Sequence, residues 1–348
     1  MSNLTSTQES DAPQIIVLGA GSIGGYIGGW LTGTGAKVTL LGRQSALDAV
    51  QVHGYTLTDL HQRKLMLKPE QIQFVTDPSV LQLADLVLVT VKGKDTHTAA
   101  ELILKHAKPN ATVVSFQNGV DNAKKLAHRL PHLNVIAGMV PFNVVTLENG
   151  HLHCGTDGHL WAASHEAWAP FLPIFEQAGL AVTQAAKFEE VQWGKLILNL
   201  NNAVNALSNL PLKQELSDRA YRQCLACLMD ETLHVLKLAG ITPAKVSKVS
   251  PSLLPSVLRL PNFIFKRLAA SMLQMDDKAR SSMWEDLQHN RTTEVDDLNG
   301  AVVDLAKSLG STAPCNARIV SLVRQAEQGK LQSILGKDLL HALTKPQK

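Results

Sequence analysis

The sequence predicts an α/β fold in which a doubly wound parallel sheet is followed by an all-helical C-terminal domain. Three observations favour this class. Strand-like apolar runs alternate with helical patterns through the first half, a glycine-rich turn joins the first run to the first helix, and helical periodicity is almost continuous from Lys187 onward. The 348 residues, 45% of them hydrophobic, suffice for two cores. We predict a disordered polar tail over residues 1–12, a sheet domain over 13–185 and a helical domain over 186–348.

The predicted elements of the first half follow in a regular order. Residues 15–18 are apolar throughout, as expected for a strand that is buried on both faces. Ligands of such sheets bind beyond the carboxyl ends of the strands, which makes Lys92 and Asn118 candidate ligand contacts. The predicted strands are 15–18, 37–41, 85–91, 112–116, 134–140, a stretch within 151–161 and 180–184; the predicted helices begin near Gly24, cover 96–107 and follow Asn118.

The second half is predicted to be helical apart from one stretch. The interval 242–277 is rich in proline, serine and leucine, and no structure is assigned to it. The predicted helices cover 188–207, 214–239, 282–309 and 317–327.

The turn after the first strand has the spacing Gly19-x-Gly21-x-x-Gly24 and leads into a helix. In a dinucleotide-binding (Rossmann) unit the first glycine makes the tight turn, the second lets the backbone approach the pyrophosphate, and the third lets helix and strand pack closely. The helix N-terminus adds N–H groups and a partial positive charge. A fortuitous glycine-rich loop is the alternative, and the strand–turn–helix context argues against it. The candidate cofactor contacts are Gly19, Ala20, Gly21, Ser22, Ile23, Gly24, Arg43, Lys92 and Asn118.

The residue after the second strand predicts which nicotinamide cofactor binds. NAD-binding units usually carry Asp or Glu there to hold the ribose 2′-hydroxyl, whereas this chain has Leu41-Gly42-Arg43. A cation without an acid favours a 2′-phosphate, so we predict NADP(H) as the cofactor.

Composition excludes several other classes of protein. The net charge is only +3, and the dispersed Lys and Arg residues do not form the basic stripe of a nucleic-acid binder. No apolar run reaches the roughly 20 residues of a membrane span. Residues 1–12 lack the basic start and apolar core of a secretory signal. We therefore expect no nucleic acid and no membrane as partner, and a homodimer stays open.

The cysteines and histidines have ordinary structural interpretations. Four cysteines do not make a disulfide framework at this length, so we expect a reducing, cytoplasmic setting. Cys224 and Cys227 form a C-x-x-C inside a long helical pattern, where two small core residues are a better interpretation than a redox motif. His151, His153 and Cys154, together with His159, have a composition that could suggest zinc. The segment is predicted to be a β-hairpin near Asn149-Gly150, and we predict no metal site there.

A polar stripe marks the first helix of the second half. At about 100° per residue, Lys195, Asn199 and Asn202 fall on one face. The bland alternative is a solvated face, but such faces favour Glu, Lys, Gln and Ala, whereas each Asn costs about half a kcal/mol relative to Ala. The repeated Asn residues therefore indicate another use for their amides.

Two further candidates lie near the chain's end and are less distinctive on their own. Ser282 and Glu285 have capping-box spacing, so Ser282 is explained by a helix start. Glu294 is explained as surface charge. In one straight helix these two candidates would lie about 18 Å apart along the axis, too far to share a small ligand.

Taken together, these motifs resemble the ketopantoate reductase (2-dehydropantoate 2-reductase) family. The resemblance runs from Ile15 to about Glu327, and the order and spacing of the motifs make it specific. The motifs are Gly19-x-Gly21-x-x-Gly24, Gln117-Asn118-Gly119-Val120, Trp193-x-Lys195-Leu-x-x-Asn199, Ser281-Ser282-Met283 and Arg291-x-Thr293-Glu294-Val-Asp296-x-Leu-Asn299-Gly300.

The resemblance implies a fold, a reaction and residue roles. Family members have a Rossmann domain, a helical domain and an active site in the cleft between them. The implied reaction is NADPH-dependent reduction of 2-dehydropantoate, a small 2-oxo acid, to pantoate, a step toward pantothenate and coenzyme A. The implied roles are Lys195 and Glu294 as catalytic residues, Asn118, Asn199 and Ser282 as substrate contacts, and Arg43 as the 2′-phosphate contact.

Departures from the family pattern concern the substrate side. Ala203 stands where members commonly have a second Asn, and Asn202 is the expected substitute. Ala279 replaces a polar residue before the serine, and the 242–277 stretch is longer than in compact members. Reduction of a different 2-oxo acid and a non-catalytic NADP(H)-binding protein remain the alternative functions.

Overall fold

The computed structural model describes residues 12–246, 249–268, 279–331 and 333–345. The predicted disordered tail, apart from Ala12, lies outside the described residues, as do two pieces of the 242–277 stretch. The chain divides into two compact units. Unit 1 is the chain up to Gln117 together with Asn122–Phe188, and unit 2 is Asn118–Asp121 together with the chain from Glu189 onward.

The main sheet of unit 1 confirms the predicted fold class. It has eight strands in the order β12-β11-β8-β7-β6-β1-β2-β5. All neighbouring strands are parallel except β8 and β11, which are antiparallel. The strands are β1 (Ile15–Leu18), β2 (Val38–Leu41), β5 (Gln73–Val75), β6 (Leu86–Val89), β7 (Thr112–Ser115), β8 (Asn134–Met139), β11 (Leu160–Ala163) and β12 (Val182–Ala185).

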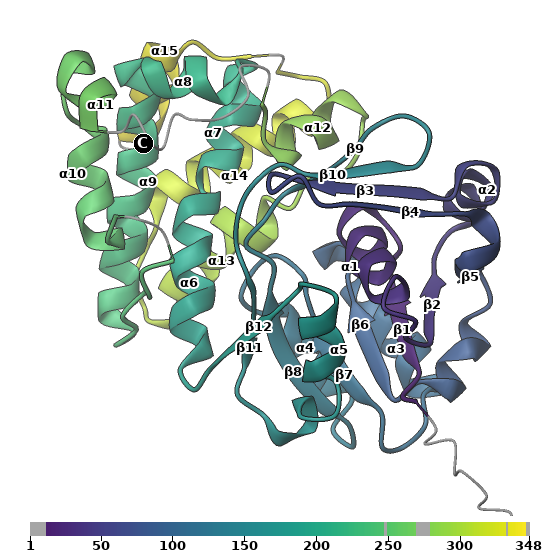
Figure 1. Cartoon of the computed structure of the whole chain (residues 1–348). Helices are drawn as coiled ribbons and strands as arrows, with labels where there is room; N and C mark the ends of the chain where they lie inside the picture. Colours follow the sequence, from purple (N-terminus) through teal and green to yellow (C-terminus); the bar gives the residue numbers. More distant parts are fainter. Residues whose placement is uncertain (1–11, 247–248, 269–278, 332, 346–348) are drawn as a thin grey trace, which may run out of the picture. The chain divides into compact units, whose positions relative to one another are not determined.

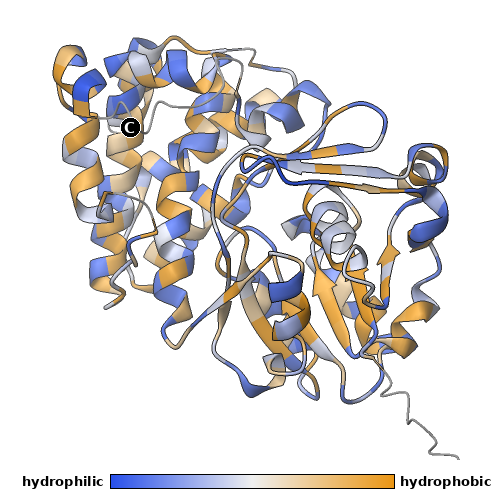
Figure 2. Ribbon diagram, viewed as in Figure 1, coloured by the Kyte–Doolittle hydropathy of each residue, from blue (hydrophilic) through white to orange (hydrophobic). Residues whose placement is uncertain are grey.

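Helices cover both faces of this sheet because its central strands are apolar on both sides (Figures 1 and 2). Successive side chains of a strand point to opposite faces. Ile15 therefore packs in the cluster that contains Ile27 of α1, whereas Ile16 packs in the cluster that contains Ile103 of α3 and Leu126 of α4. The helices of unit 1 are α1 (Ser22–Thr32), α2 (Gln44–His53), α3 (Thr96–His106), α4 (Asn122–Arg129) and α5 (Leu172–Gln177), with 3-10 turns at Pro69–Gln71, Pro78–Leu83, Gly93–Asp95 and Glu166–Trp168.

A second sheet lies over α1 (Figure 1). The sequence analysis did not assign two of its strands, β3 and β4. The predicted hairpin around Asn149 is present as the antiparallel pair β9–β10. Gly25 and Gly29 of α1 allow the close approach, because a Cβ atom at either position would meet side chains of this sheet, including Leu57. The strands are β3 (Tyr55–Asp59), β4 (Lys64–Leu67), β9 (Val144–Thr146) and β10 (His151–Cys154), in the order β4-β3-β10-β9.

The regular secondary structure in the described part of unit 2 is all helical, and the helices pack around α9. Leu228 and Val235 of α9 are fully buried in one cluster with Leu207 and Ile319. No helix in the described ranges is long and apolar enough to cross a membrane. The helices are α6 (Phe188–Asn199), α7 (Asn201–Ser208), α8 (Leu212–Ser217), α9 (Arg219–Leu238), α10 (Leu254–Leu258), α11 (Asn262–Leu268), α12 (Ser282–Gln288), α13 (Ala301–Ser308), α14 (Pro314–Glu327) and α15 (Gly336–Thr344), with a 3-10 turn at Pro251–Leu253 and a π-helical turn at Asp296–Gly300.

Three helices that were predicted to be continuous are interrupted. The first divides into α6 and α7 at Leu200. The second divides into α8 and α9 because the Asp218 side chain accepts a hydrogen bond from the Ala220 amide (2.8 Å) and starts a new helix. The predicted helix 282–309 ends at Gln288, and Asn290 then adopts a left-handed conformation (φ 50°). The separation of about 18 Å expected for one straight helix therefore does not apply to Ser282 and Glu294, because no straight helix joins them.

The glycine turn yields a stability prediction. A Cβ atom at Gly24 would overlap the Gly19 carbonyl oxygen and the Thr90 hydroxyl, whereas nothing lies within 4 Å of a Cβ atom at Gly21. We expect Gly24→Ala to lower the free energy of unfolding by about 1–3 kcal/mol and the matched control Gly21→Ala to change it by less than about 0.5 kcal/mol. Urea denaturation measures both; equal losses would contradict the packing role of Gly24.

Candidate active site

The glycine turn of unit 1 lies where the direction of strand order reverses. From β1 the chain builds outward through β2 and β5, then returns to β6 on the other side of β1. Such a switch point is where doubly wound sheets bind nucleotides. Gly19 has φ 109°, and its carbonyl oxygen accepts a hydrogen bond from the Thr90 hydroxyl (2.8 Å). The turn leads into α1, whose N-cap, Gly21, has no side chain over the free helix amides.

The other candidate cofactor contacts of unit 1 lie around this turn. Ala20 lies in the turn, and Ser22 and Ile23 begin α1, with the Ser22 hydroxyl hydrogen-bonded to that of Thr146 (2.8 Å). Arg43 is the N-cap residue of α2 and lies two residues after the end of β2. Lys92 follows β6 and is half-buried.

Arg43 presents its charge to solvent. Its side chain is 82% exposed, and its one ion-pair partner among the described residues is Asp95, whose Oδ2 lies 3.5 Å from Nη2 of Arg43. An exposed pair at this distance contributes little to stability. The guanidinium can therefore exchange this contact for a phosphate without a large cost.

A buried network that the sequence analysis missed orders the loops at this edge of the sheet. The Gln117 amide donates to the Val91 carbonyl (3.1 Å) and to the Thr96 hydroxyl (2.8 Å). Thr96 in turn donates to Asn122 at the start of α4 (3.1 Å). The Ser115 hydroxyl donates to Gln117 (3.0 Å). The signal in the sequence was a glutamine directly after an apolar strand, where a buried amide needs several partners.

Three of the predicted residues come together in unit 2. The Lys195 ammonium donates to Asn118 Oδ1 (3.3 Å), and Asn118 Nδ2 donates to Glu294 Oε2 (2.8 Å). Lysine can only donate and a carboxylate can only accept, so this orientation of the Asn118 amide is the one that satisfies both neighbours. The amide thus bridges the acid and the base.

The surroundings of Lys195 tune its proton affinity. Burial lowers the pKa of Lys195 from 10.5 to about 8, and the nearby Glu294 opposes this shift. A lysine with this pKa is still mostly protonated at pH 7 and releases its proton more readily than a solvated lysine.

Neighbouring contacts fix where the three side chains lie. Trp193 and Ile197 of α6 are buried in the core of unit 2, so the face that carries Lys195 is turned away from that core. Thr293 donates both its amide and its hydroxyl to Glu327 of α14 (2.7 Å each), which anchors the residue before Glu294. A π-helical turn follows directly, a form that often occurs at functional sites.

The remaining substrate candidates lie on α6, α7 and α12. Asn199 ends α6 and is half-buried, as is Asn202 in the first turn of α7. Ser282 is exposed, and the predicted cap is wrong by one residue: Ser281 is the N-cap, and its hydroxyl accepts from the Trp284 amide (3.1 Å). Ser282 is therefore not required to start the helix.

Ala203 does not lie on the polar stripe. It is fully buried in the core of unit 2. A side chain at this position contacts other helices, so the absence of Asn here removes no exposed amide.

The cysteines and the possible metal ligands have structural explanations. No group of three or more His, Cys, Asp and Glu residues among the described ones could hold a metal ion. The four cysteines are free thiols. Cys224 is buried in the core, and Cys227 interacts with Cys315 of α14, so the C-x-x-C spacing reflects helix packing.

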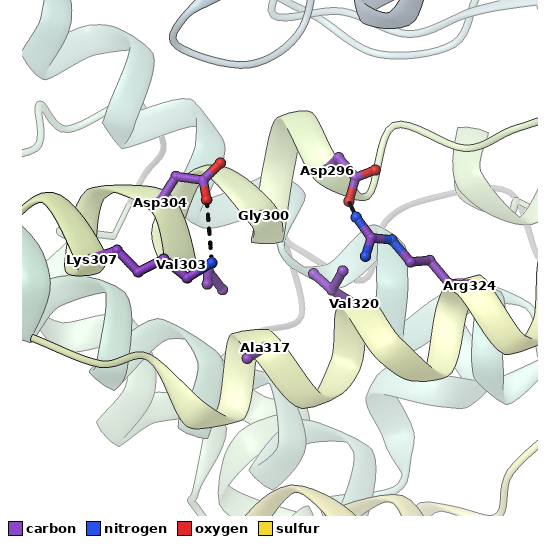
Figure 3. Close-up of a pocket in the computed structure, with 8 residues that line it drawn as sticks. All are labelled: Asp296, Gly300, Val303, Asp304, Lys307, Ala317, Val320 and Arg324. Carbon is purple, nitrogen blue, oxygen red and sulfur yellow. Dashed lines mark hydrogen bonds and ion pairs between the residues drawn. The ribbon is translucent and has the colours of Figure 1, made fainter.

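A surface pocket of about 290 Å³ lies between the π-helical turn, α13 and α14 (Figure 3). Its charged groups are already matched as the ion pairs Asp296–Arg324 (2.7 Å) and Asp304–Lys307 (3.9 Å). It contains none of the predicted site residues, and we assign it no chemistry.

Comparison with known proteins agrees with the resemblance. The family model "Ketopantoate reductase PanE/ApbA" matches residues 15–167, and its C-terminal counterpart matches residues 187–327. A 2-dehydropantoate 2-reductase of Halobacterium salinarum is 30% identical over 322 residues, which is 90% of this chain and 99% of that protein.

Solved structures share the fold. A PanE/ApbA family ketopantoate reductase from Ralstonia eutropha JMP134 superimposes with a TM-score of 0.77 at 29% identity, over 91% of this chain and 99% of that one. D-mandelate dehydrogenase with NADH and anilino(oxo)acetate has a TM-score of 0.75 at 16% identity, over 91% and 99% of the two chains, a likeness of fold alone. The two family models and the relative from Halobacterium salinarum establish that the chain belongs to the ketopantoate reductase family.

Proposed function

We propose that this protein reduces 2-dehydropantoate to pantoate with NADPH in the cytoplasm, as a step toward pantothenate and coenzyme A. The hydrogen-bonded arrangement of Lys195, Asn118 and Glu294 carries this proposal, because it combines a proton donor of lowered pKa with groups that hold it in place. Membership of the family supports the substrate, and the free cysteines support a reducing compartment.

Reduction of the 2-oxo group requires a hydride at carbon and a proton at oxygen. Bound NADPH would supply the hydride. Lys195 donates the proton to the carbonyl oxygen as negative charge develops there, and its ammonium stabilises that charge before the transfer. Glu294 and Asn118 orient the ammonium, and one of them accepts a hydrogen bond from the new hydroxyl.

The cofactor is proposed to lie against the glycine turn of unit 1. The open space beside Gly21 admits a pyrophosphate close to the backbone, and the exposed Arg43 suits the 2′-phosphate. Asn199, Asn202 and Ser282 are the proposed partners of the substrate carboxylate.

Two alternatives differ in what they bind and turn over. Ala279 in place of a polar residue favours a different 2-oxo acid as substrate. A panel of 2-oxo acids assayed by loss of NADPH absorbance decides between 2-dehydropantoate and another substrate. A non-catalytic NADP(H)-binding protein would shift in melting temperature with NADPH yet oxidise it with no member of the panel. The intact contact of Lys195 with Asn118 argues against that reading of the chain.

The proton donor is tested by Lys195→Ala. We expect turnover to fall by about 10²–10⁴-fold, because general acid catalysis is lost, while the affinity for NADPH stays near wild type. The exposed Lys237→Ala on α9 is the matched control and should keep full turnover. Wild-type turnover in a folded Lys195→Ala protein would exclude Lys195 as the donor.

The pH dependence of reduction follows from the same lysine. Lys195 with a pKa of about 8 is protonated below pH 8 and loses its proton above it, so kcat/KM for the 2-oxo acid should fall about tenfold per pH unit above 8. Glu294 raises the pKa of Lys195, so in Glu294→Gln the fall should begin at lower pH. A wild-type profile that stays flat to pH 10 would be incompatible with this assignment.

Cofactor choice is tested by Arg43→Ala. Loss of one charge-assisted contact to the 2′-phosphate should raise the KM for NADPH at least about tenfold and leave the KM for NADH unchanged. Lys105→Ala, an exposed cation on α3, is the control. Equal losses with both cofactors, or a wild-type preference for NADH, would refute the role of Arg43.

A further inference from the structure

Unit 2 contains a carboxyl group that the proposed reaction does not use. Glu215 of α8 is fully buried, and within the described part of the chain it forms no ion pair. A buried acid without a cation is costly to keep ionised. The hydrogen bonds of Glu215 indicate what this buried acid does.

The first hydrogen bonds lead from α8 through α7 to the start of α12. Asn205 Nδ2 donates to Glu215 Oε2 (2.7 Å) and to the Leu210 carbonyl (2.9 Å). Asn205 Oδ1 accepts from the amide of Ser281 (2.9 Å), the N-cap residue of α12. Asn205 is itself fully buried, so each of these bonds is sheltered from water.

A second connection runs directly between α7 and α12. The Ser281 hydroxyl donates to the carbonyl oxygen of Asn202 (3.2 Å) while it accepts from the Trp284 amide (3.1 Å). Asn202 and Ser282 are both proposed substrate contacts. The hydrogen bonds of Asn205 and Ser281 therefore hold α7, which carries Asn202, against the start of α12, which carries Ser282.

Two unpaired atoms indicate the form in which Glu215 occurs. Glu215 Oε1 and Asn201 Oδ1 are both buried without a hydrogen-bond partner among the described residues. Both atoms are acceptors when Glu215 is ionised, whereas a protonated Oε1 is a donor. Burial raises the pKa of Glu215 to about 8, and the neighbouring side chains of Asn205 and Asn201 oppose this rise. The neutral acid can thus donate toward Asn201 while its other oxygen accepts from Asn205.

We propose that Glu215 is a positioning residue for substrate binding: as a neutral acid it holds Asn205, which fixes the start of α12 against α7 and so places Ser282 and Asn202 for the 2-oxo acid. The proposal rests on the proposed function for the identity of the substrate. Glu215 acts through Asn205 and Ser281 and contacts no reacting atom.

The test compares three substitutions in α8. Glu215→Leu removes the hydrogen bonds and should raise the KM for 2-dehydropantoate about fivefold or more, with the KM for NADPH unchanged. Glu215→Gln keeps an uncharged group of the same shape that both accepts and donates, and should behave like wild type. Gln214→Leu is the matched control, because it makes a similar substitution at the exposed neighbouring position.

Hydrogen exchange tests the anchoring without any substrate. Amides of residues 280–288 should exchange faster in Glu215→Leu than in wild type, Glu215→Gln or Gln214→Leu. Asn205→Ala interrupts the same connection while leaving Glu215 in place, so it should also raise the KM and speed exchange even if Glu215→Leu fails to fold. If the wild type reduces another 2-oxo acid, the proposed function fails, and the KM for that acid replaces the first measurement.

Three results would overturn the positioning role. They are unchanged exchange over 280–288 in the Leu and Ala variants, an unchanged KM for the 2-oxo acid despite faster exchange, and a Glu215→Gln protein as impaired as Glu215→Leu.

Discussion

The Lys195 ammonium loses hydration because protein atoms surround it, and this desolvation is the constraint on which the arrangement of Asn118 and Glu294 depends. Burial lowers its pKa, and Glu294 supplies the opposing charge. Asn118 lies between them and satisfies both, since its carbonyl oxygen faces the ammonium and its amide nitrogen faces the carboxylate. Loss of the amide would remove this partner from a half-buried donor and a half-buried acceptor at once, which costs more than one hydrogen bond contributes.

Asn118 follows a strand of unit 1 in the sequence but belongs to unit 2. It comes three residues after β7, yet the segment Asn118–Asp121 belongs by its contacts to unit 2. Gln117, directly before it, is held by Val91 and Thr96 of unit 1. The residue that precedes Asn118 is therefore buried and hydrogen-bonded within unit 1.

Side-chain caps, which apolar periodicity does not reveal, start two helices of unit 2. Asp218 follows α8 and starts α9 with one side-chain hydrogen bond, and Ser281 starts α12 in the same way. Periodicity cannot reveal such breaks, because apolar residues on both sides of a cap face the same core. The choice between Ser281 and Ser282 depended on Asn205 and Asn202, which lie far away in the sequence.

The sequence by itself determined the fold class, the glycine turn after β1, the cation after β2 and the residues Asn118, Lys195 and Glu294, because these depend on local spacing or on motifs that match a family. Only the tertiary structure decided that one amide joins Lys195 to Glu294, that Ala203 faces the core, and that β3 and β4 build a second sheet over α1. It also decided that Glu215, an ordinary acid in the sequence, is buried next to Asn205. The physical reason is that burial and hydrogen-bond partners depend on which distant segments pack together, and no local pattern records this.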